Sequence, residues 1–113
     1  MTTKHRENPK PGPVNRLVIY RPKQDHESAF EAILREHGPA LRGSGLLTDE
    51  PVRVWRAIDL RREGEPRPYF VETFQWRDEK ASDLAHQTPT VMAVWETMGP
   101  HLDTMTLTTL DPL

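Results

Sequence analysis

The sequence has no cysteine, no long apolar run and no concentration of charge of one sign. The absence of cysteine excludes disulfides, thiolate catalysis and cysteine-ligated metals. No segment is apolar over enough residues to span a membrane or to form the core of a signal peptide. The formal net charge is −2, and the basic residues are spread along the chain, which is atypical of a nucleic-acid-binding surface. We therefore expect a cytoplasmic protein that binds neither nucleic acid nor membranes.

The five histidines have no spacing that is typical of a metal site. No HxxxH motif occurs, and no pair of carboxylates has the spacing of metal ligands. The sequence therefore predicts no metal site.

A chain of 113 residues is long enough for one domain with one core. Residues 1–13 are rich in proline and charge and have no large apolar side chain after Met1, so they cannot offset the entropy of ordering by burial. We predict a flexible tail over residues 1–13 and a single domain over residues 14–113. Because a domain of this size buries a modest share of its surface, it gains stability from forming an oligomer.

The first half of the domain predicts a strand, a helix and a second strand. Residues 14–20 place apolar side chains on both faces of a pleat, which predicts a strand with both of its faces packed against other parts of the structure. A helix follows, with Asp25 as its N-cap and its end near Gly38 and Pro39. Leu41 keeps the helical spacing, so a further turn after Pro39 stays open. Residues 52–60 alternate in polarity and predict the second strand.

The second and third strands are predicted to form a hairpin around Gly64, with the third strand at residues 69–76. If the turn is centred on Gly64, Arg56 lies opposite Glu72 in the middle of an otherwise apolar face. The register stays open at this stage, because a slip of one residue exchanges the partners.

The last third of the chain predicts a broken helix and a fourth strand. Asp78 is placed to cap the helix, and Thr88 followed by Pro89 is typical of a fresh helix start. We therefore expect two short helices in line, followed by a threonine-rich strand at residues 104–110.

The order β-α-β-β-α-β predicts an α+β fold of the ferredoxin-like class. In this sandwich, one four-stranded antiparallel sheet carries both helices on a single face. The other face would expose Trp55, Tyr69 and Val71. We expect a second copy of the chain to cover it, related by a two-fold axis, so that the two sheets close into an α/β barrel.

The segment FVETFQWRDEKASDLAHQTPTVMAVWETM, residues 70–98, resembles the antibiotic biosynthesis monooxygenase-like proteins of the dimeric α/β-barrel superfamily. The likeness extends over roughly residues 14–110. It implies a homodimer with one pocket per subunit between the sheet and the helices. For the oxygenase branch it implies oxidation of an electron-rich aromatic compound by oxygen without metal or flavin. The superfamily also contains isomerases, haem-degrading enzymes and proteins of unknown role, so the fold alone does not decide the chemistry.

The haem-degrading branch is disfavoured by its own pattern. Asn15 resembles the asparagine that this branch is expected to carry on the first strand. The expected tryptophan falls at about Ala85, and the expected ligating histidine falls at about Trp95. Two of the three residues are therefore missing.

The resemblance and the hairpin together give three candidate catalytic residues: Glu72, His86 and Arg56. On the floor of a pocket, Arg56 would bind a phenolate or carboxylate and Glu72 would accept a proton. The alternative is a structural cross-strand ion pair. His86 is either a general base or an exposed or capping histidine.

Six further residues are candidates for binding a planar substrate. Their side chains would supply flat apolar walls or hydrogen bonds, although they serve equally well as ordinary core or strand residues. They are Asn15, Tyr20, Phe70, Phe74, Trp76 and Trp95.

The leading hypothesis is a cofactor-independent monooxygenase-like enzyme that oxidises a small aromatic or polyketide-type ligand. In this scheme Glu72 or His86 removes a proton, and Arg56 and Asn15 stabilise the oxyanion that develops. One alternative is a non-catalytic ligand-binding or accessory dimeric protein, and another is a cofactor-free isomerase or cyclase that uses the same base without oxygen. The sequence does not name the substrate.

Overall fold

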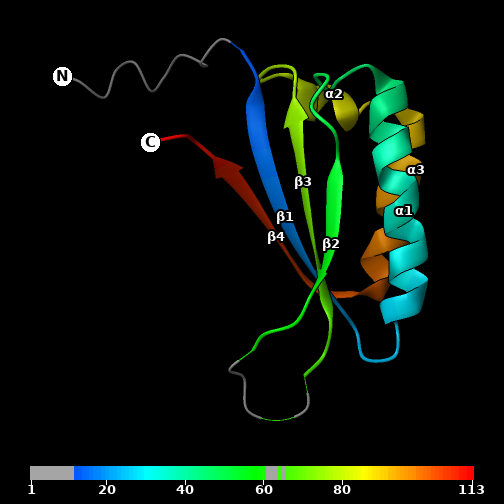
Figure 1. Ribbon diagram of the computed structural model, residues 1–113. Coiled ribbons are helices and arrows are strands. Elements are labelled where there is room, and N and C mark those ends of the chain that lie inside the picture. Colours follow the sequence, from blue (N-terminus) through cyan, green and yellow to red (C-terminus); the bar gives the residue numbers. More distant parts are fainter. Residues whose placement is uncertain (1–11, 61–63, 65) are drawn as a thin grey trace, which may run out of the picture.

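The computed structural model describes residues 12–60, 64 and 66–113 (Figure 1). Nearly all of the predicted tail, and part of the loop around Gly64, therefore lie outside the described residues. The order of the strands and longer helices confirms the predicted β-α-β-β-α-β pattern. The elements are β1 (Val14–Pro22), α1 (Glu27–Ser44), β2 (Arg53–Ala57), β3 (Tyr69–Trp76), α2 (Ala81–Ala85), α3 (Pro89–Met98), the short 3-10 helix η2 (Gly99–His101) and β4 (Leu102–Leu110).

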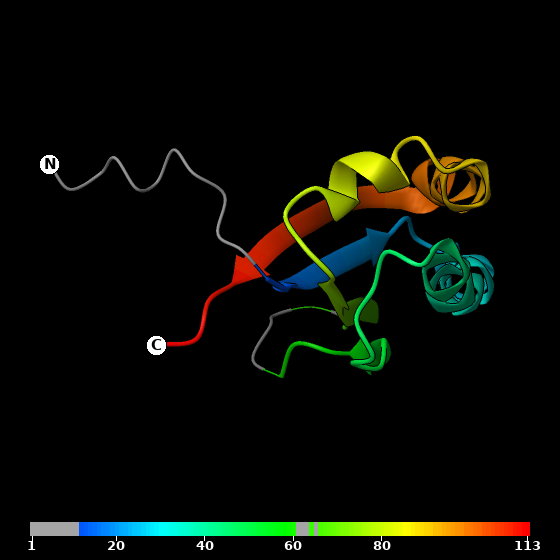
Figure 2. The same cartoon turned by 90° about the horizontal axis from the view of Figure 1, so that it is seen from above.

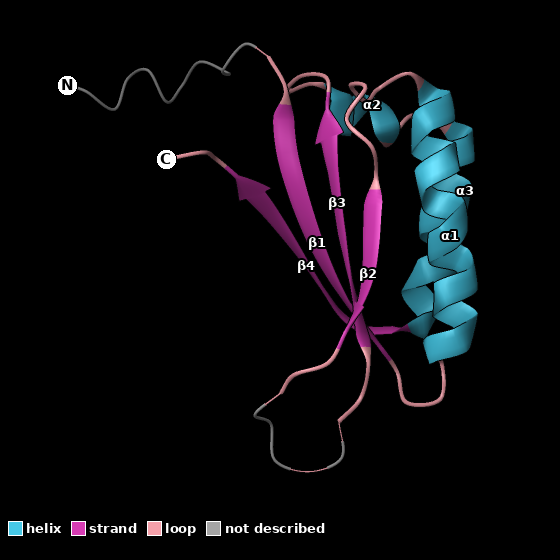
Figure 3. Cartoon of the chain, in the orientation of Figure 1, coloured by secondary structure: helices cyan, strands magenta, loops and turns pink. Residues whose placement is uncertain are grey.

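The four strands form one antiparallel sheet in the order β2-β3-β1-β4. The helices lie on one side of this sheet, and α1 and α3 pack side by side (Figures 2 and 3). This arrangement confirms the predicted ferredoxin-like sandwich. No helix of the described residues is long and apolar enough to cross a membrane.

Helix α1 begins and ends at positions that differ from the prediction. Asp25 has a φ of 69° and is not the cap, because His26 is the residue that precedes the helix. The helix continues through Pro39 and ends at Ser44. The next residue, Gly45, caps it with a φ of 76°, the left-handed conformation that glycine adopts without a penalty. Leu41 lies beyond the proline and is fully buried, so its packing offsets the backbone hydrogen bond that Pro39 removes.

The broken second helix is confirmed. Thr88 has an extended backbone, with φ −102° and ψ 110°, and Pro89 opens α3 at a position where its missing N–H is not needed. The N-cap of α2 is Lys80 and not Asp78 as predicted. Asp78 lies two residues earlier, where its side chain accepts a hydrogen bond from the backbone N–H of Lys80 at 2.9 Å. Two separate helices therefore lie along this edge of the sandwich.

The hairpin register is shifted by two residues from the one predicted. Val54 lies opposite Glu72, and Arg56 lies opposite Phe70. The predicted pairing of Arg56 with Glu72 is therefore wrong. Because the shift is even, every side chain keeps its predicted face of the sheet.

The strand that carries the core, β3, alternates strictly in burial. Its even-numbered side chains point toward the helices and are buried, and its odd-numbered side chains are half-buried on the other side. The buried set includes Glu72, with 0% of its surface exposed, and it faces His37 of α1, which is 2% exposed. A carboxylate and an imidazole are thus part of a core that is otherwise aromatic and aliphatic.

We call the side of the sheet that faces away from the helices the open face. No helix of the described residues covers it (Figure 1). Its centre is apolar and only half-buried. The strand pairing and the pleat assign to it Leu17, Ile19, Trp55, Tyr69, Val71, Thr106 and Thr108.

Candidate functional site

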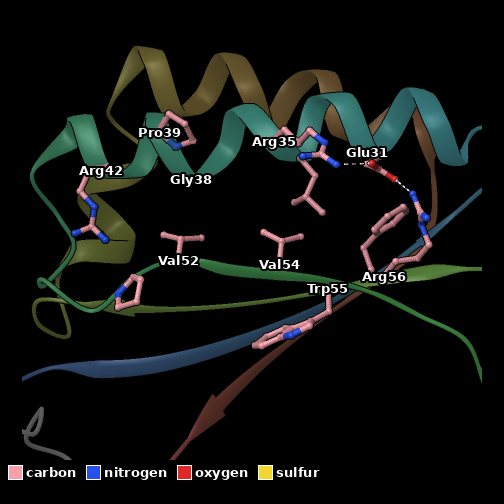
Figure 4. Close-up of a pocket in the computed structure, with 12 residues that line it drawn as sticks. Glu31, Arg35, Gly38, Pro39, Arg42, Val52, Val54, Trp55 and Arg56 are labelled. Carbon is pink, nitrogen blue, oxygen red and sulfur yellow. Dashed lines mark hydrogen bonds and ion pairs between the residues drawn. The ribbon is translucent and has the colours of Figure 1, made fainter.

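The first hollow is an open groove between α1 and β2, which we call the β2 groove, with a volume of about 780 Å³. Val52 and Val54 point from the strand side toward α1, and Trp55 points to the opposite side (Figure 4). Glu31 forms ion pairs with both Arg35 and Arg56 at the rim of this groove. The hydrogen bonds from Arg35 and then Arg56 hold the pKa of the Glu31 carboxyl below its usual range.

Arg56 therefore has a different partner from the one predicted. Its side chain is 59% exposed and is paired with Glu31, and it lines the β2 groove. An exposed ion pair of this kind contributes little to stability. Arg56 does not share a cavity with the other candidate catalytic residues.

The second hollow lies between the helix side of the sheet and helices α2 and α3, and we call it the aromatic cavity. Its volume is about 490 Å³, which suits a ligand of a few fused rings. Five of the candidate residues line it together: Tyr20, Phe74, Trp76, His86 and Trp95. Arg16, which donates a hydrogen bond to Thr109, supplies a cation to this cavity in place of Arg56.

A chain of hydrogen bonds runs behind the wall of the aromatic cavity, and we call it the buried relay. The Tyr20 hydroxyl donates to Oε1 of Glu72 at 2.6 Å. Nδ1 of His37 lies 2.8 Å from Oε2 of Glu72, and the indole N–H of Trp95 donates to Nε2 of His37 at 2.8 Å. The relay therefore joins residues of β1, β3, α1 and α3.

These contacts assign the tautomer of His37. An indole N–H is only a donor, so Nε2 of His37 is an acceptor and carries no proton. Nδ1 carries the proton and donates to the Glu72 carboxylate. His37 is therefore neutral, and Glu72 accepts hydrogen bonds from two neutral donors. Donors of this kind are what a buried carboxylate needs to offset the loss of water.

Tyr20 is held in its protonated form. Burial raises the pKa of the Tyr20 phenol well above its usual value of 10.0, and the charge of Glu72 and the hydrogen bond to it raise this pKa further. The phenol is thus a donor to Glu72 and not a proton acceptor at neutral pH.

His37 is the functional candidate that the sequence reasoning missed. Its position follows the buried stripe of α1, which runs through Phe30, Leu34, His37 and Leu41 at helical spacing. A histidine inside such a stripe faces the sheet, so the helical pattern was the signal that could have found it. The wrong helix end at Pro39 hid this signal, because it placed His37 in the last turn.

The remaining candidates lie around the cavity or away from it. His86 is exposed, and its ring packs edge-on against Trp95, with 4.8 Å between the ring centres. Trp76 is buried, and its indole N–H has no hydrogen-bond partner among the described residues. Asn15 accepts a hydrogen bond from Gln75 at 2.8 Å on the open face, and Phe70 lines the β2 groove.

Within residues 12–60, 64 and 66–113, no group of three or more potential ligand side chains is placed to hold a metal ion. The aromatic cavity is lined by flat apolar side chains, by the guanidinium of Arg16, and by Tyr20, His37 and Trp95 of the buried relay. These groups suit the binding of a planar ligand and the transfer of a proton.

Comparison with known proteins identifies solved structures that share this fold. No protein-family model matches the sequence, and no curated protein matches it. Among solved structures, an antibiotic biosynthesis monooxygenase aligns with a TM-score of 0.68 and 17% identity, over 88% of this chain and 98% of that one. SnoaB, a cofactor-independent oxygenase from Streptomyces nogalater determined as a mutant, aligns with a TM-score of 0.67 and 12% identity, over 88% and 92%. A dabb family protein with a ferredoxin-like fold from Mesorhizobium loti aligns with a TM-score of 0.67 and 18% identity, over 90% and 98%.

The chain therefore has the fold of antibiotic biosynthesis monooxygenase structures, as its resemblance to them predicts. At these identities the likeness concerns the fold, and the chemistry has to be argued from the cavity.

Proposed function

We propose that this chain, which shares its fold with antibiotic biosynthesis monooxygenase structures, is a cofactor-independent monooxygenase-like enzyme that oxidises an aromatic or polyketide-type substrate in the aromatic cavity. The observation that carries the proposal is the buried carboxylate relay behind an aromatic-lined cavity of about 490 Å³. A relay of this kind accepts a proton, and the aromatic walls hold a planar ring next to it.

The reaction balances with dioxygen as the oxidant. A methylene group between two electron-rich rings loses a proton to the protein, and the carbanion passes electrons to oxygen and forms a C–O bond. Loss of water from the resulting peroxide leaves a carbonyl, so CH₂ and O₂ become C=O and H₂O. Carbon loses four electrons and oxygen gains four.

The protein would supply a base and a hydrogen-bond donor. Glu72 has no exposed surface, so it takes up a substrate proton only through a side chain that is hydrogen-bonded to it. The indole N–H of Trp76, which has no partner among the described residues, would donate a hydrogen bond to the oxygen that becomes negative during the reaction. His86, at the exposed side of the cavity, is the second candidate base. Arg56 is not part of this site, because it lies in the β2 groove.

We also propose that the chain is a homodimer through the open face. Trp55 is 48% exposed there, next to the half-buried side chains of Ile19 and Val71. A second copy on a two-fold axis would cover this apolar centre with its own, because such an interface is self-complementary. Burial of this face would add apolar area to a small core.

The alternative is a ligand-binding or accessory protein. Every polar atom that Glu72 presents to His37 and Tyr20 is satisfied without a ligand, which is also what a purely structural network requires. An isomerase or cyclase is a third possibility, since it needs the same base and no oxygen.

Oxygen uptake by the purified protein with a panel of quinols and anthrones tests the proposal. We expect turnover that Glu72→Gln lowers at least tenfold, and that the surface control Glu96→Gln leaves unchanged. Binding without oxygen uptake would favour the accessory protein, and product formation without oxygen uptake would favour the isomerase. A haemin titration followed by the Soret band tests the disfavoured haem chemistry separately.

A further inference from the structure

We propose that His37 is the residue that takes the proton from the ligand, and that Trp95 is a gate that occupies His37 until an aromatic hydroxyl displaces it. The catalytic part of this inference rests on the proposed function. The binding part, which assigns the cavity to aromatic ligands that carry a hydroxyl donor, does not require turnover.

The chemistry of the buried relay selects His37. Glu72 is fully buried and already accepts two hydrogen bonds. The Tyr20 hydroxyl donates to Glu72, and the raised pKa of this phenol keeps its proton in place. Nε2 of His37 is the basic atom of the relay that is directed away from Glu72, and His37 lines the aromatic cavity. The lone pair of this nitrogen is therefore the one that a ligand can reach.

The indole of Trp95 shows which ligand group belongs at that nitrogen. Trp95 donates a hydrogen bond to Nε2 at 2.8 Å, and an indole N–H never accepts a proton. A hydroxyl in the same place makes the same hydrogen bond and can then give up its proton. The indole N–H of Trp95 thus lies where a substrate hydroxyl would donate to Nε2 of His37.

The surroundings of Trp95 allow it to leave. Trp95 is only half-buried, and it packs edge-on against His86, which is exposed. It lies on α3, which the break at Pro89 separates from α2. Its movement exchanges one hydrogen bond for another, so the net cost is small when the ligand supplies a hydroxyl. A ligand without a donor leaves Nε2 of His37 unpaired and is rejected.

The proton transfer balances within the relay. The ligand O–H bond breaks and an N–H bond forms at Nε2, while the proton on Nδ1 stays in its hydrogen bond to Glu72. The imidazolium then lies 2.8 Å from the Glu72 carboxylate, which stabilises its charge. The ligand becomes an electron-rich phenolate or enolate. When the hydroxyl is the enol form of a ketone conjugated with the methylene group, this anion is the same delocalised carbanion that the proposed oxidation requires.

Binding of two matched probes tests the gate. 1-Naphthol carries the donor, and 1-methoxynaphthalene has the same rings with the donor masked. By calorimetry we expect 1-naphthol to bind at least tenfold more tightly, and its binding to shift the NMR resonance of the Trp95 indole N–H and the ¹⁵N resonance of His37 Nε2. Equal affinities with an unmoved Trp95 resonance, or no binding of either probe at millimolar concentration, would overturn the proposal.

Two substitutions identify the residues. Trp95→Phe keeps an aromatic ring and removes the competing donor, so we expect 1-naphthol to bind about two- to tenfold more tightly. The matched control Trp76→Phe removes the indole N–H of another tryptophan that lines the same cavity, without touching His37. The ¹⁵N resonance of His37 Nε2 should therefore keep its wild-type position in this variant. A Trp95→Phe protein that binds 1-naphthol more weakly than wild type would contradict the gate.

His37→Gln separates this inference from the proposed function. We expect this variant to lose the preference for 1-naphthol and to lose oxygen uptake with any substrate that the wild type turns over. If the variant does not fold, Trp95→Phe still tests the gate. Retained oxygen uptake in folded His37→Gln would overturn the role of His37 and leave the proposed function intact. Absence of oxygen uptake in the wild type, with the naphthol preference present, would overturn the proposed function alone.

Discussion

The burial of Tyr20 predicts how the stability of the protein depends on alkaline pH. The pKa of this phenol is raised in the folded protein by burial and by Glu72, whereas in the unfolded chain it is close to 10.0. The folded state thus holds the proton more tightly than the unfolded state. The corresponding stability is fully present below pH 10 and is lost as the pH rises toward the folded pKa.

The magnitude follows from linkage. With an unfolded pKa of about 10, ionisation of the unfolded phenol lowers the free energy of unfolding by about 0.4 kcal/mol at pH 10 and about 1.4 kcal/mol at pH 11. The loss continues at about 1.4 kcal/mol per pH unit until the folded phenol itself ionises. Glu72→Gln should narrow the pH interval over which this stability is lost, because two of the three causes that raise the pKa of Tyr20 come from Glu72.

The assay is favourable because the chain has two tyrosines. Tyr69→Phe leaves Tyr20 as the one source of tyrosinate absorbance, and urea denaturation from pH 8 to pH 11 gives the free energy of unfolding. The double variant Tyr20→Phe/Tyr69→Phe is the control, since lysine ionisation is common to both. If tyrosinate appears near pH 10 while the circular dichroism stays native, or if the two variants lose stability in parallel, the reasoning about Tyr20 is refuted.

Three other perturbations test the relay, the groove and the open face. Glu72→Ala leaves the Tyr20 hydroxyl and the His37 Nδ1–H unpaired, so it should lower the free energy of unfolding in urea by about 2–4 kcal/mol, and more than Glu72→Gln does, because Gln keeps an acceptor oxygen. Equal losses would show that an acceptor oxygen at this position does not stabilise the two donors. Arg56→Ala removes an exposed ion pair and should cost less than about 1 kcal/mol in the same assay, so a larger loss would mean that Arg56 is buried in the assembled protein. Trp55→Glu should convert the proposed dimer to a monomer in analytical ultracentrifugation, whereas the neighbouring Val54→Glu, at 44% exposure on the other side of the strand, should not. A dimer that survives Trp55→Glu would place the interface elsewhere.

The architecture could be predicted from the sequence because its signals are local. The alternation of β2 and β3 assigned side chains to faces, and Thr88 with Pro89 marked the break between α2 and α3. The end of α1 could not be predicted from such local signals. Gly38 and Pro39 are locally unfavourable in a helix, but burial of Leu41 against the sheet overrides them.

For the candidate site, the sequence predicted which face of the sheet a strand residue occupies, but it did not predict which residue lies opposite it. Strand alternation placed Phe74 and Trp76 correctly on one face of the hairpin, and they line one cavity with Tyr20, His86 and Trp95. The partner of Glu72 was not predictable, since strand alternation fixes a face without fixing the register. Because the register is shifted by two residues, Val54 and not Arg56 lies opposite Glu72. The hydrogen-bond partners of the Glu72 carboxylate are His37 and Tyr20 instead.

The positions of the three tryptophans give the molecule three built-in optical probes. Trp55 lies on the open face, Trp76 in the core and Trp95 on the buried relay. In protein that keeps a single indole, the emission maximum of Trp55 would follow the proposed association of two chains, that of Trp76 would follow unfolding, and that of Trp95 would follow the proposed occupancy of His37. Stopped-flow fluorescence would thus time these three events separately in the same chain, without an added label.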